Sequence, residues 1–207
     1  MKLFLFDFDG VLVESLDIYE KAVSSSLASM HKPLKRGREE FLELFEGNFY
    51  ESLAQRGVDL KEFMEVSGSL LAQVDYTKMQ PVTAMIPIVE KLQKNNMLLV
   101  ISSNHSGTIS AALEKFNLHG YFQEVLGSDF LFSKKDKMHY AAKKYQIALD
   151  DIYYIGDTTG DIKEGRAAGV KTVGVTWGWH SQEKMAAARP DYLFNEPQEL
   201  LQLSPGH

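Results

Sequence analysis

The sequence contains no cysteine. A disulfide scaffold, a thiolate zinc site and a cysteine nucleophile are therefore excluded together. Long hydrophobic stretches are missing too: the longest apolar runs, such as 97–101, hold about five residues, whereas a membrane-spanning helix needs ~20. The amino terminus has too short an apolar stretch before its first acid, Asp7, for a signal peptide. We therefore expect a cytoplasmic protein without a membrane partner.

Positive charge is in short supply as well. The chain has 22 Lys and Arg against 28 Asp and Glu, which gives a net charge of −6. Because a nucleic-acid-binding surface needs a basic surplus, we expect no nucleic-acid partner. The length of 207 residues suits one domain, or a core with a modest insertion, and is sufficient for a hydrophobic core.

Short apolar runs that end at polar residues recur along the chain and indicate buried strands. Between them, hydrophobic residues such as Ile109, Leu113 and Phe116 repeat with helical spacing. Strands that alternate with helices predict an α/β fold, a Rossmann-like parallel sheet core flanked by helices. The strand-like runs lie at 3–6, 97–103, 152–156 and 170–176, with weaker candidates at 124–127 and 192–194.

Residues 15–80 break this rhythm, because they contain helical periods and no apolar run of strand length. We therefore predict a small all-helical insertion after the first strand, with the α/β core formed by 1–14 and 81–207. Pro81 marks the return to the sheet. One helical stripe of the insertion comprises Leu60, Phe63, Ser67, Leu70 and Val74.

Polar residues follow four of the predicted strands. Ligands of open parallel sheets bind outside the carboxyl ends of the strands, where the strand order reverses. The first strand is a good candidate for that position, so we expect the four segments to meet in one crevice. Their polar residues are Asp7 and Asp9, then Ser102, Ser103 and Asn104, then the lysines of 134–137, and finally Asp157 and Asp161.

Four carboxylates in one small site cannot all ionise readily unless a cation lies between them. A site with oxygen ligands alone favours Mg²⁺ over zinc or copper. Magnesium held by carboxylates in turn indicates a phosphate-bearing substrate, whose phosphoryl oxygens Ser103, backbone N–H groups and a lysine could bind. The residues thus predict phosphoryl transfer on a small phosphorylated metabolite.

The same four segments resemble, in order and spacing, the motifs of the haloacid dehalogenase superfamily. Residues 6–15 (FDFDGVLVES) are similar to its opening motif, D-x-D-G-T-L-x-D-S, with Val11 in place of the usual Thr. Residues 101–104 (ISSN) resemble the second motif, Lys134 the third, and 156–161 (GDTTGD) the fourth, G-D-x-x-x-D.

This resemblance implies a Mg²⁺-dependent hydrolase of phosphomonoesters, of the phosphoglycolate phosphatase type, with a helical cap. Asp7 would be the nucleophile that accepts the phosphoryl group, and Asp9 the general acid and base. Lys134 would offset the accumulating negative charge. Ser103 and Asn104 would hold the phosphoryl group.

The resemblance also implies the metal ligands. Asp7, the backbone carbonyl of Asp9, and Asp157 would bind Mg²⁺. Asp161 would be either a direct ligand or a residue that contacts the ligands. The insertion would cover the crevice and contact the leaving group. Gly47 could support a loop of the insertion near the site. The basic residues of the insertion are the candidates for contact with the leaving group: Lys32, Lys35, Arg36, Arg38 and Arg56.

Several alternatives stay open at this point. Lys135 or Lys137 could replace Lys134, and Ser102 could replace Ser103 if the strand register differs by one. A sugar phosphomutase would share every motif but return the phosphoryl group to its substrate. A non-catalytic phosphate- and Mg²⁺-binding module is the alternative from another class. A dehalogenase is disfavoured by the second acid, Asp9.

Overall fold

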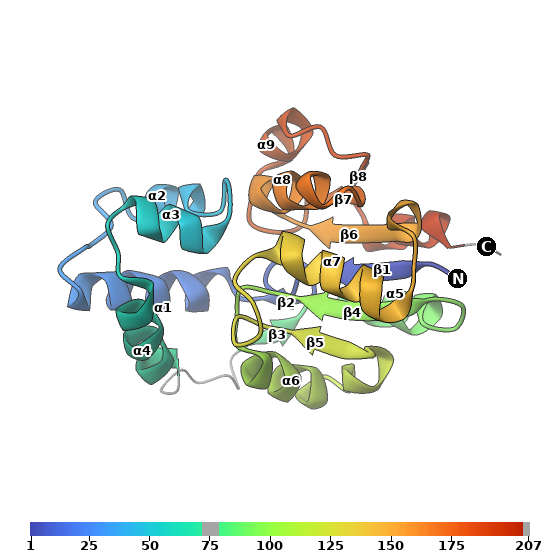
Figure 1. Cartoon of the computed structure of the whole chain (residues 1–207), viewed down its shortest axis with the longest axis horizontal. Coiled ribbons are helices and arrows are strands. Elements are labelled where there is room, and N and C mark those ends of the chain that lie inside the picture. The colour runs from blue at the N-terminus through green and yellow to red at the C-terminus, as the bar shows by residue number, and fades with distance from the viewer. Residues whose placement is uncertain (72–78, 205–207) are drawn as a thin grey trace.

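The structure, a computed structural model, describes residues 1–71 and 79–204 (Figure 1). Its main sheet has six strands in the order β5-β4-β1-β6-β7-β8, and all neighbouring pairs are parallel. All six predicted strands, including the two weaker candidates, are present, so the predicted Rossmann-like α/β fold is confirmed. The strands are β1 (Leu3–Phe6), β4 (Met97–Ile101), β5 (Glu124–Leu126), β6 (Ile152–Gly156), β7 (Lys171–Val175) and β8 (Tyr192–Phe194).

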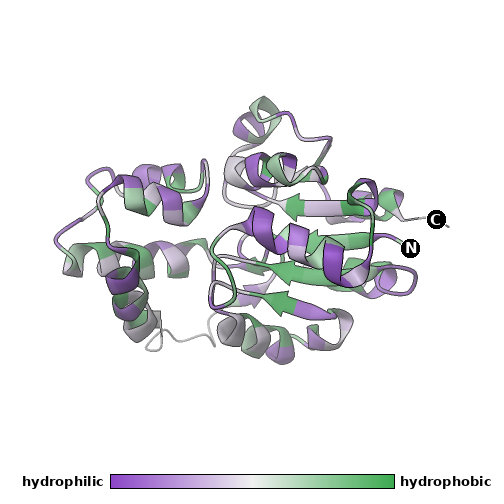
Figure 2. Ribbon diagram, in the orientation of Figure 1, coloured by the Kyte–Doolittle hydropathy of each residue, from purple (hydrophilic) through white to green (hydrophobic). Residues whose placement is uncertain are grey.

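Helices cover both faces of this sheet. Side chains alternate along β1, so Phe4 and Phe6 face one hydrophobic cluster and Leu3 and Leu5 the other. Because both faces are covered, all four residues are fully buried, as their unbroken apolar run predicted. Figure 2 shows the apolar strands inside a more hydrophilic outer layer. The first cluster includes residues of α5 (Ile86–Leu92), α6 (Ser106–Lys115) and η5 (Pro197–Leu203), and the second residues of α7 (Lys134–Tyr145) and α8 (Thr159–Ala168).

The chain connections make β1 the point where the strand order reverses. After β1 the chain forms β4 and β5 on one side, then crosses to β6, β7 and β8 on the other. Consequently β1 lies between β4 and β6, and the carboxyl ends of these three strands are neighbours. The predicted reversal of the strand order at β1 is thus confirmed. The remaining core elements are α9 (Gln182–Ala187) and the short 3₁₀ helices η2 (Thr83–Met85), η3 (His119–Tyr121) and η4 (Leu149–Asp151).

The described part of 15–80 is helical up to Leu71, and Val74 of the predicted stripe lies outside the described residues. A two-stranded antiparallel ribbon, Val13–Glu14 (β2) with Gln80–Pro81 (β3), joins this insertion to the sheet. Sequence analysis missed the ribbon because each of its strands has two residues, too few to show an alternating hydrophobic pattern. The extent of the two domains stays a prediction. The helices of the insertion are α1 (Leu16–Ser29), α2 (Arg38–Glu43), α3 (Phe49–Gln55) and α4 (Leu60–Leu71).

The insertion has its own aromatic cluster, which also includes a residue from the core segment of the chain. Trp179 packs among Tyr19, Phe41 and Phe45, at ring-centroid distances of 5.6, 5.6 and 4.9 Å. Phe45 in turn stacks on Phe49 at 4.9 Å. Trp179 therefore ties the insertion to the loop that follows β7.

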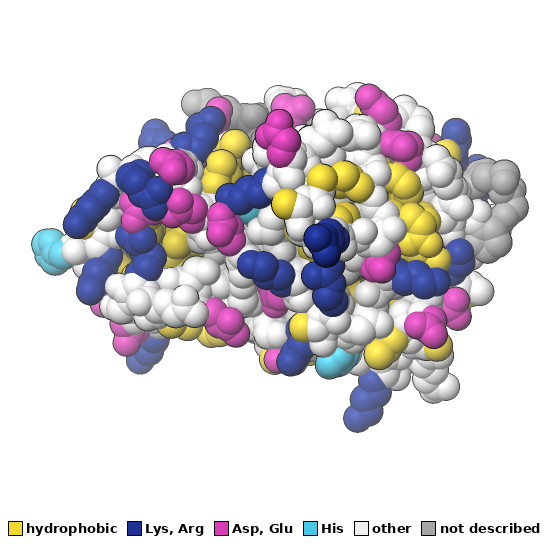
Figure 3. Space-filling view, turned by 90° about the horizontal axis from the view of Figure 1, so that it is seen from above, with side chains coloured by type: hydrophobic (Ala, Val, Ile, Leu, Met, Phe, Trp, Pro, Cys, Tyr) yellow, Lys and Arg dark blue, Asp and Glu magenta, His cyan; other side chains and the backbone are white. Residues whose placement is uncertain are grey.

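The arginines of the insertion pair with nearby acids. Arg38 contacts Asp17 at 2.5 Å and Glu20 at 2.7 Å. Figure 3 shows basic and acidic side chains side by side over this part of the surface, on the left of the view. Arg36 pairs with Glu39 and Glu43, and Arg56 with Glu40. These three candidates for substrate binding are thus engaged within the insertion.

Glu40 makes the most extensive of these contacts. One carboxylate oxygen accepts the backbone N–H groups of Lys35 and Arg36, at 2.5 and 3.0 Å, and the other accepts Arg56 Nη1 at 2.5 Å. These bonds, that from the Arg36 amide above all, lower the pKa of the buried Glu40 to about 2.

We predict that Glu40→Gln destabilises the protein by about 1.5–3 kcal/mol at pH 7, because charge-assisted hydrogen bonds are lost. Since the folded-state pKa lies below the ordinary 4.5, the stabilisation is complete above about pH 4.5 and is lost as the pH falls through about 2. Urea unfolding at pH 7, 4 and 3 should show that the difference in the free energy of unfolding between variant and wild type decreases as the pH falls. A difference independent of pH would contradict a stabilising role of the ionised Glu40. Glu39→Gln, an exposed control, should cost less than about 1 kcal/mol.

Candidate active site

Asp7 and Asp9 lie directly beyond β1, in a loop whose shape requires glycine. Gly10 has a φ of 77°, in the left-handed region. A Cβ there would come within 2.0 Å of Asp157 Oδ2, so the backbone passes against the second acidic segment. Asp7 Oδ1 accepts the N–H of Phe8 at 2.7 Å. The first and fourth motifs are thereby brought into direct contact.

Asp161 lies in the first turn of α8 and is hydrogen-bonded through both oxygens. Oδ2 accepts the N–H and hydroxyl of Thr158, at 3.1 and 2.6 Å, in a capping box. Oδ1 accepts Tyr154 Oη at 2.7 Å and Lys134 Nζ at 2.6 Å. Burial alone would raise the pKa of Asp161, but Lys134 and the hydroxyl donors lower it below its ordinary value. Asp161 is therefore a carboxylate, and in this form it holds the Lys134 ammonium in position.

Lys134, the first residue of α7, joins the acids of two strands. Its Nζ lies 2.7 Å from Asp7 Oδ2 and 2.6 Å from Asp161 Oδ1, and the residue is only 7 % exposed. Burial opposes the charge, yet the two carboxylates raise the pKa of Lys134 well above its ordinary value. Of the alternatives, Lys137 is buried and donates to the Ser102 carbonyl at 2.6 Å, and Lys135 is half-buried. The geometry favours Lys134, whose role stays a prediction.

The carboxylates of Asp7, Asp157 and Asp161, here called the acid cluster, offer oxygens that all lie within 4.8 Å of one another. Burial, followed by its acidic neighbours, raises the pKa of Asp157 well above its ordinary value. Burial also raises the pKa of Asp7 to about 7, despite Lys134. Three buried carboxylates therefore face one ammonium group.

The acid cluster also contains an oxygen that lacks a donor. Asp157 Oδ2 accepts the N–H of Trp179 at 2.6 Å, but Oδ1 is buried without a hydrogen-bond partner. Such an oxygen is costly unless a cation binds it. With oxygen ligands and excess negative charge, the residues present fit a hard divalent cation such as Mg²⁺.

Asp9 lies beside the acid cluster but is not one of its members. Its residue is 8 % exposed, and Oδ1 has no hydrogen-bond partner. Burial raises the pKa of the Asp9 carboxyl, although Ser15 and Lys134 offset part of that rise. A buried carboxyl with one unpaired oxygen, in the same small cavity as Asp7, is suitable for carrying a proton.

The second motif follows β4 and forms one wall of this small cavity, which Asp7, Asp9 and Lys134 also line. Ser102 Oγ accepts the N–H of Asn104 at 3.0 Å. Ser103 lines both this cavity and a neighbouring one, and its carbonyl accepts Tyr50 Oη from α3 at 2.6 Å. Both serines thus reach the site, and the choice of Ser103 with Asn104 stays a prediction.

The insertion closes over this cavity through backbone contacts. Phe45 O accepts the N–H of Gly160 at 2.9 Å, and Leu42 O lies 3.1 Å from His180 Nε2. A Cβ at Gly160 would come within 2.3 Å of Gly47 O. The segment around Gly47 therefore rests on the first turn of α8, next to Asp161, in agreement with the loop position expected for it.

Sequence analysis missed several residues that position the site. Glu164 Oε1 accepts Lys134 N at 2.8 Å and Asn48 Nδ2 at 3.0 Å, and so connects the lysine with the insertion. Tyr50 and His180 likewise act across long sequence separations, so no local pattern indicates them. Tyr154 and Thr158, which both bond Asp161, were also missed. For Thr158 a local signal exists, because a threonine three residues before an acid is a capping signal.

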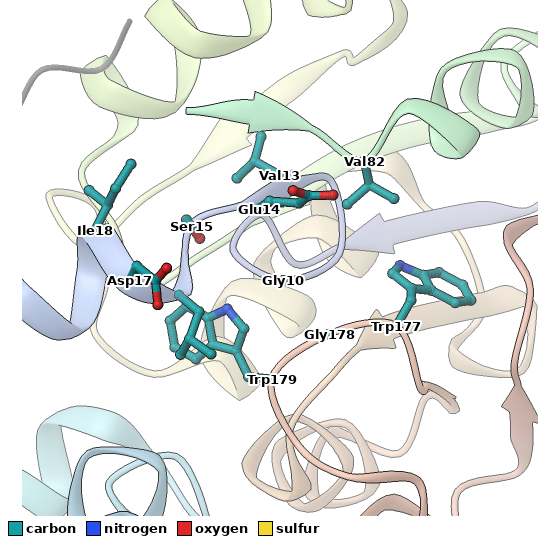
Figure 4. A pocket seen from close by; sticks show the side chains of 11 residues that line it. Gly10, Val13, Glu14, Ser15, Asp17, Ile18, Val82, Trp177, Gly178 and Trp179 are labelled. Atoms are coloured by element: carbon teal, nitrogen blue, oxygen red, sulfur yellow. The ribbon is translucent and has the colours of Figure 1, made fainter. Parts of the chain in front are cut away.

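A larger cavity of about 380 Å³ lies on the other side of Gly10 (Figure 4). Glu14 at the end of the first core segment and Asp17 at the start of the insertion line it, together with Trp177 and Trp179. Trp179 borders both this cavity and the small one. Among the described residues, no lysine or arginine lines the larger cavity, so it does not suit a phosphate.

The fold and site together define an α/β enzyme with an acidic, lysine-bridged centre at the carboxyl edge of a parallel sheet. A model of the haloacid dehalogenase-like hydrolase family matches residues 4–175. The chain belongs to this family, as its motifs indicated, and is a hydrolase.

Relatives resemble the chain over nearly its whole length. A phosphoglycolate phosphatase from Aquifex aeolicus is 29 % identical over 221 residues, which covers 100 % of this chain and 98 % of the relative. One from Haemophilus influenzae is 26 % identical over 222 residues, 98 % and 97 % of the two chains. A haloacid dehalogenase-like hydrolase from Streptococcus pneumoniae has a TM-score of 0.80 at 22 % identity, with coverage of 98 % and 97 %.

We predict that Mg²⁺ raises the melting temperature, because it relieves repulsion within the acid cluster. At roughly 100 times its Kd, a bound ion adds about 2.7 kcal/mol of stability. Asp157→Asn should lose most of this shift in a thermal unfolding assay, whereas the exposed control Asp151→Asn should keep it. An unchanged shift in Asp157→Asn would remove Asp157 from the metal site.

A second prediction concerns closure by the insertion. Gly160→Ala places a methyl group against the carbonyls of Phe45 and Gly47, and such overpacking costs typically ~1–3 kcal/mol. We expect faster hydrogen exchange in segment 42–50. Gly120→Ala is the control, because a Cβ there meets nothing within 4 Å. Equal protection in both variants would show that the contact at Gly160 does not hold the insertion in place.

Proposed function

We propose that this hydrolase is a Mg²⁺-dependent phosphatase that acts on a small phosphomonoester through an aspartyl-phosphate intermediate on Asp7. The observation that carries the proposal is the position of Lys134 Nζ, within 2.7 Å of both Asp7 and Asp161. Lys134 lowers the pKa that burial would otherwise give Asp7, and so favours the nucleophilic carboxylate, while it compensates incoming phosphate charge. Relatives named phosphoglycolate phosphatase support a small phosphorylated substrate.

In the first step, an Asp7 oxygen attacks phosphorus and the ester P–O bond breaks. The bonding electrons stay with the leaving oxygen, which takes a proton from Asp9 and departs as an alcohol. In the second step, water loses a proton to Asp9 and attacks the phosphorus of the aspartyl phosphate. The Asp7 carboxylate is restored and inorganic phosphate is released.

The surrounding residues would orient the phosphoryl group. Ser103 and Asn104 would donate hydrogen bonds to its oxygens from the end of β4, and Lys134 would bind it from the opposite wall. Asp7, the backbone carbonyl of Asp9, and Asp157 would hold Mg²⁺, while Asp161 holds Lys134 in place. The bound ion would neutralise charge and align the reacting groups.

We further propose that residues 15–80 form a cap domain over a core of 1–14 and 81–207. The contacts of Phe45, Leu42 and Tyr50 with core residues support this division. Within the described residues, no helix is both long enough and apolar enough to cross a membrane. The cytoplasmic location stays a prediction.

The proposal predicts Mg²⁺-dependent release of phosphate from p-nitrophenyl phosphate, abolished by EDTA. Lys134→Met should lower kcat by roughly 10²–10³-fold, because a preorganised cation is lost. The neighbouring Lys135→Met is the control and should retain wild-type kcat, and circular dichroism should show that both variants are folded. Metal-independent activity, or a Lys134→Met variant as fast as the wild type, would contradict the mechanism.

A further inference from the structure

A second cavity, of about 90 Å³, adjoins the small cavity that holds Asp7 and Asp9. Tyr19 and Ser103 line both, so the two spaces meet at the proposed phosphoryl position. Its walls come from α1, α3 and α4 of the insertion and from the loop after β4. A leaving group that points away from Asp7 toward the insertion would enter this cavity, here called the leaving-group cavity.

The lining of the leaving-group cavity is uncharged. Among the described residues, no Lys, Arg, Asp or Glu lines it. Hydroxyl groups of Tyr50, Ser67 and Ser128 alternate with apolar side chains. Among the described residues, the only imidazole in the lining is that of His105, whose Nδ1 accepts the N–H of Gly107 at 3.1 Å. The apolar lining residues are Ala22, Val23, Phe63 and Met64.

The arginines of the insertion and Lys134 are already paired with acids. Arg36, Arg38 and Arg56 contact acids of the insertion, and Lys134 is held by Asp7 and Asp161. An acid contacts the start of α6, next to the loop after β4: Asp129 accepts the N–H and hydroxyl of Ser106 at 2.8 and 2.6 Å. Within the part of the chain that the structure describes, an anionic leaving group would thus be desolvated near an acid and without a fixed cation.

We propose that the leaving group of the natural substrate is a small neutral alcohol, hydroxylated or partly apolar, and not a carboxylate such as glycolate. This inference rests on the proposed phosphatase function. It distinguishes the chain from its relatives named phosphoglycolate phosphatase, whose substrate carries a carboxylate next to the phosphate ester.

The test compares two esters of nearly equal size, 2-phosphoglycolate and 2-hydroxyethyl phosphate, in the presence of Mg²⁺. We expect kcat/KM to be roughly tenfold or more higher for the neutral ester, because a buried carboxylate without a cation is poorly tolerated. Equal or faster hydrolysis of 2-phosphoglycolate would overturn the inference and leave the phosphatase function intact. Hydrolysis of neither ester, nor of p-nitrophenyl phosphate, would overturn the phosphatase function and the inference with it.

A gain-of-function pair tests the same cavity. Gly68 of α4 lines it, and a Cβ there meets nothing within 4 Å. Gly68→Lys should therefore place an ammonium in or at the cavity, while Gly68→Gln is a neutral control of similar length. We expect Gly68→Lys to raise the ratio of kcat/KM for 2-phosphoglycolate over the neutral ester by about tenfold relative to Gly68→Gln. Equal ratios in the two variants would contradict the assignment of this cavity to the leaving group.

Discussion

The site depends on one buried ion-pair network, in which the Lys134 ammonium bridges the carboxylates of Asp7 and Asp161. These residues come from the ends of β1 and the starts of α7 and α8, so the network fixes three segments relative to one another. Removing one partner of such a pair leaves an uncompensated buried charge, which typically costs ~3–5 kcal/mol. The network is also unbalanced, since Asp157 adds a third carboxylate with a free buried oxygen. The ammonium of Lys134 does not balance the three carboxylates, and a bound divalent cation would supply the missing positive charge.

Close backbone packing gives this network its geometry. At Gly10 and at Gly160, even a methyl group would overlap atoms of another segment, Asp157 in one case and the Gly47 carbonyl in the other. The first contact holds the loop after β1 against the loop after β6. The second seats the insertion on the turn that presents Asp161. Two glycines thus connect the position of the acids with the closure of the cavity above them.

The sequence was sufficient to predict the sheet and the segments that meet at its edge. The run 3–6 is apolar at every position because both faces of β1 are covered, and Asp7 follows where that cover ends. The choice among the lysines required the structure, because Lys134 and Lys137 are both buried. The Lys137 ammonium donates to a backbone carbonyl, whereas that of Lys134 contacts two carboxylates. Tyr50 was invisible to any local pattern because its partner, Ser103, lies 53 positions away.

The two parts of the chain carry different information about the reaction. In the proposed mechanism, the acid cluster and Lys134 determine what happens at phosphorus, and the sequence displays the motifs that contain them. We propose that the leaving group is recognised where the insertion meets the core, and there the chemistry depends on which charges remain unpaired after folding. The arginines of the insertion look like substrate ligands in the sequence, yet all three are paired with Asp17, Glu40 and neighbouring acids. The name of a relative at 29 % identity thus supports the proposed chemistry at phosphorus more directly than any identity of the group attached to it.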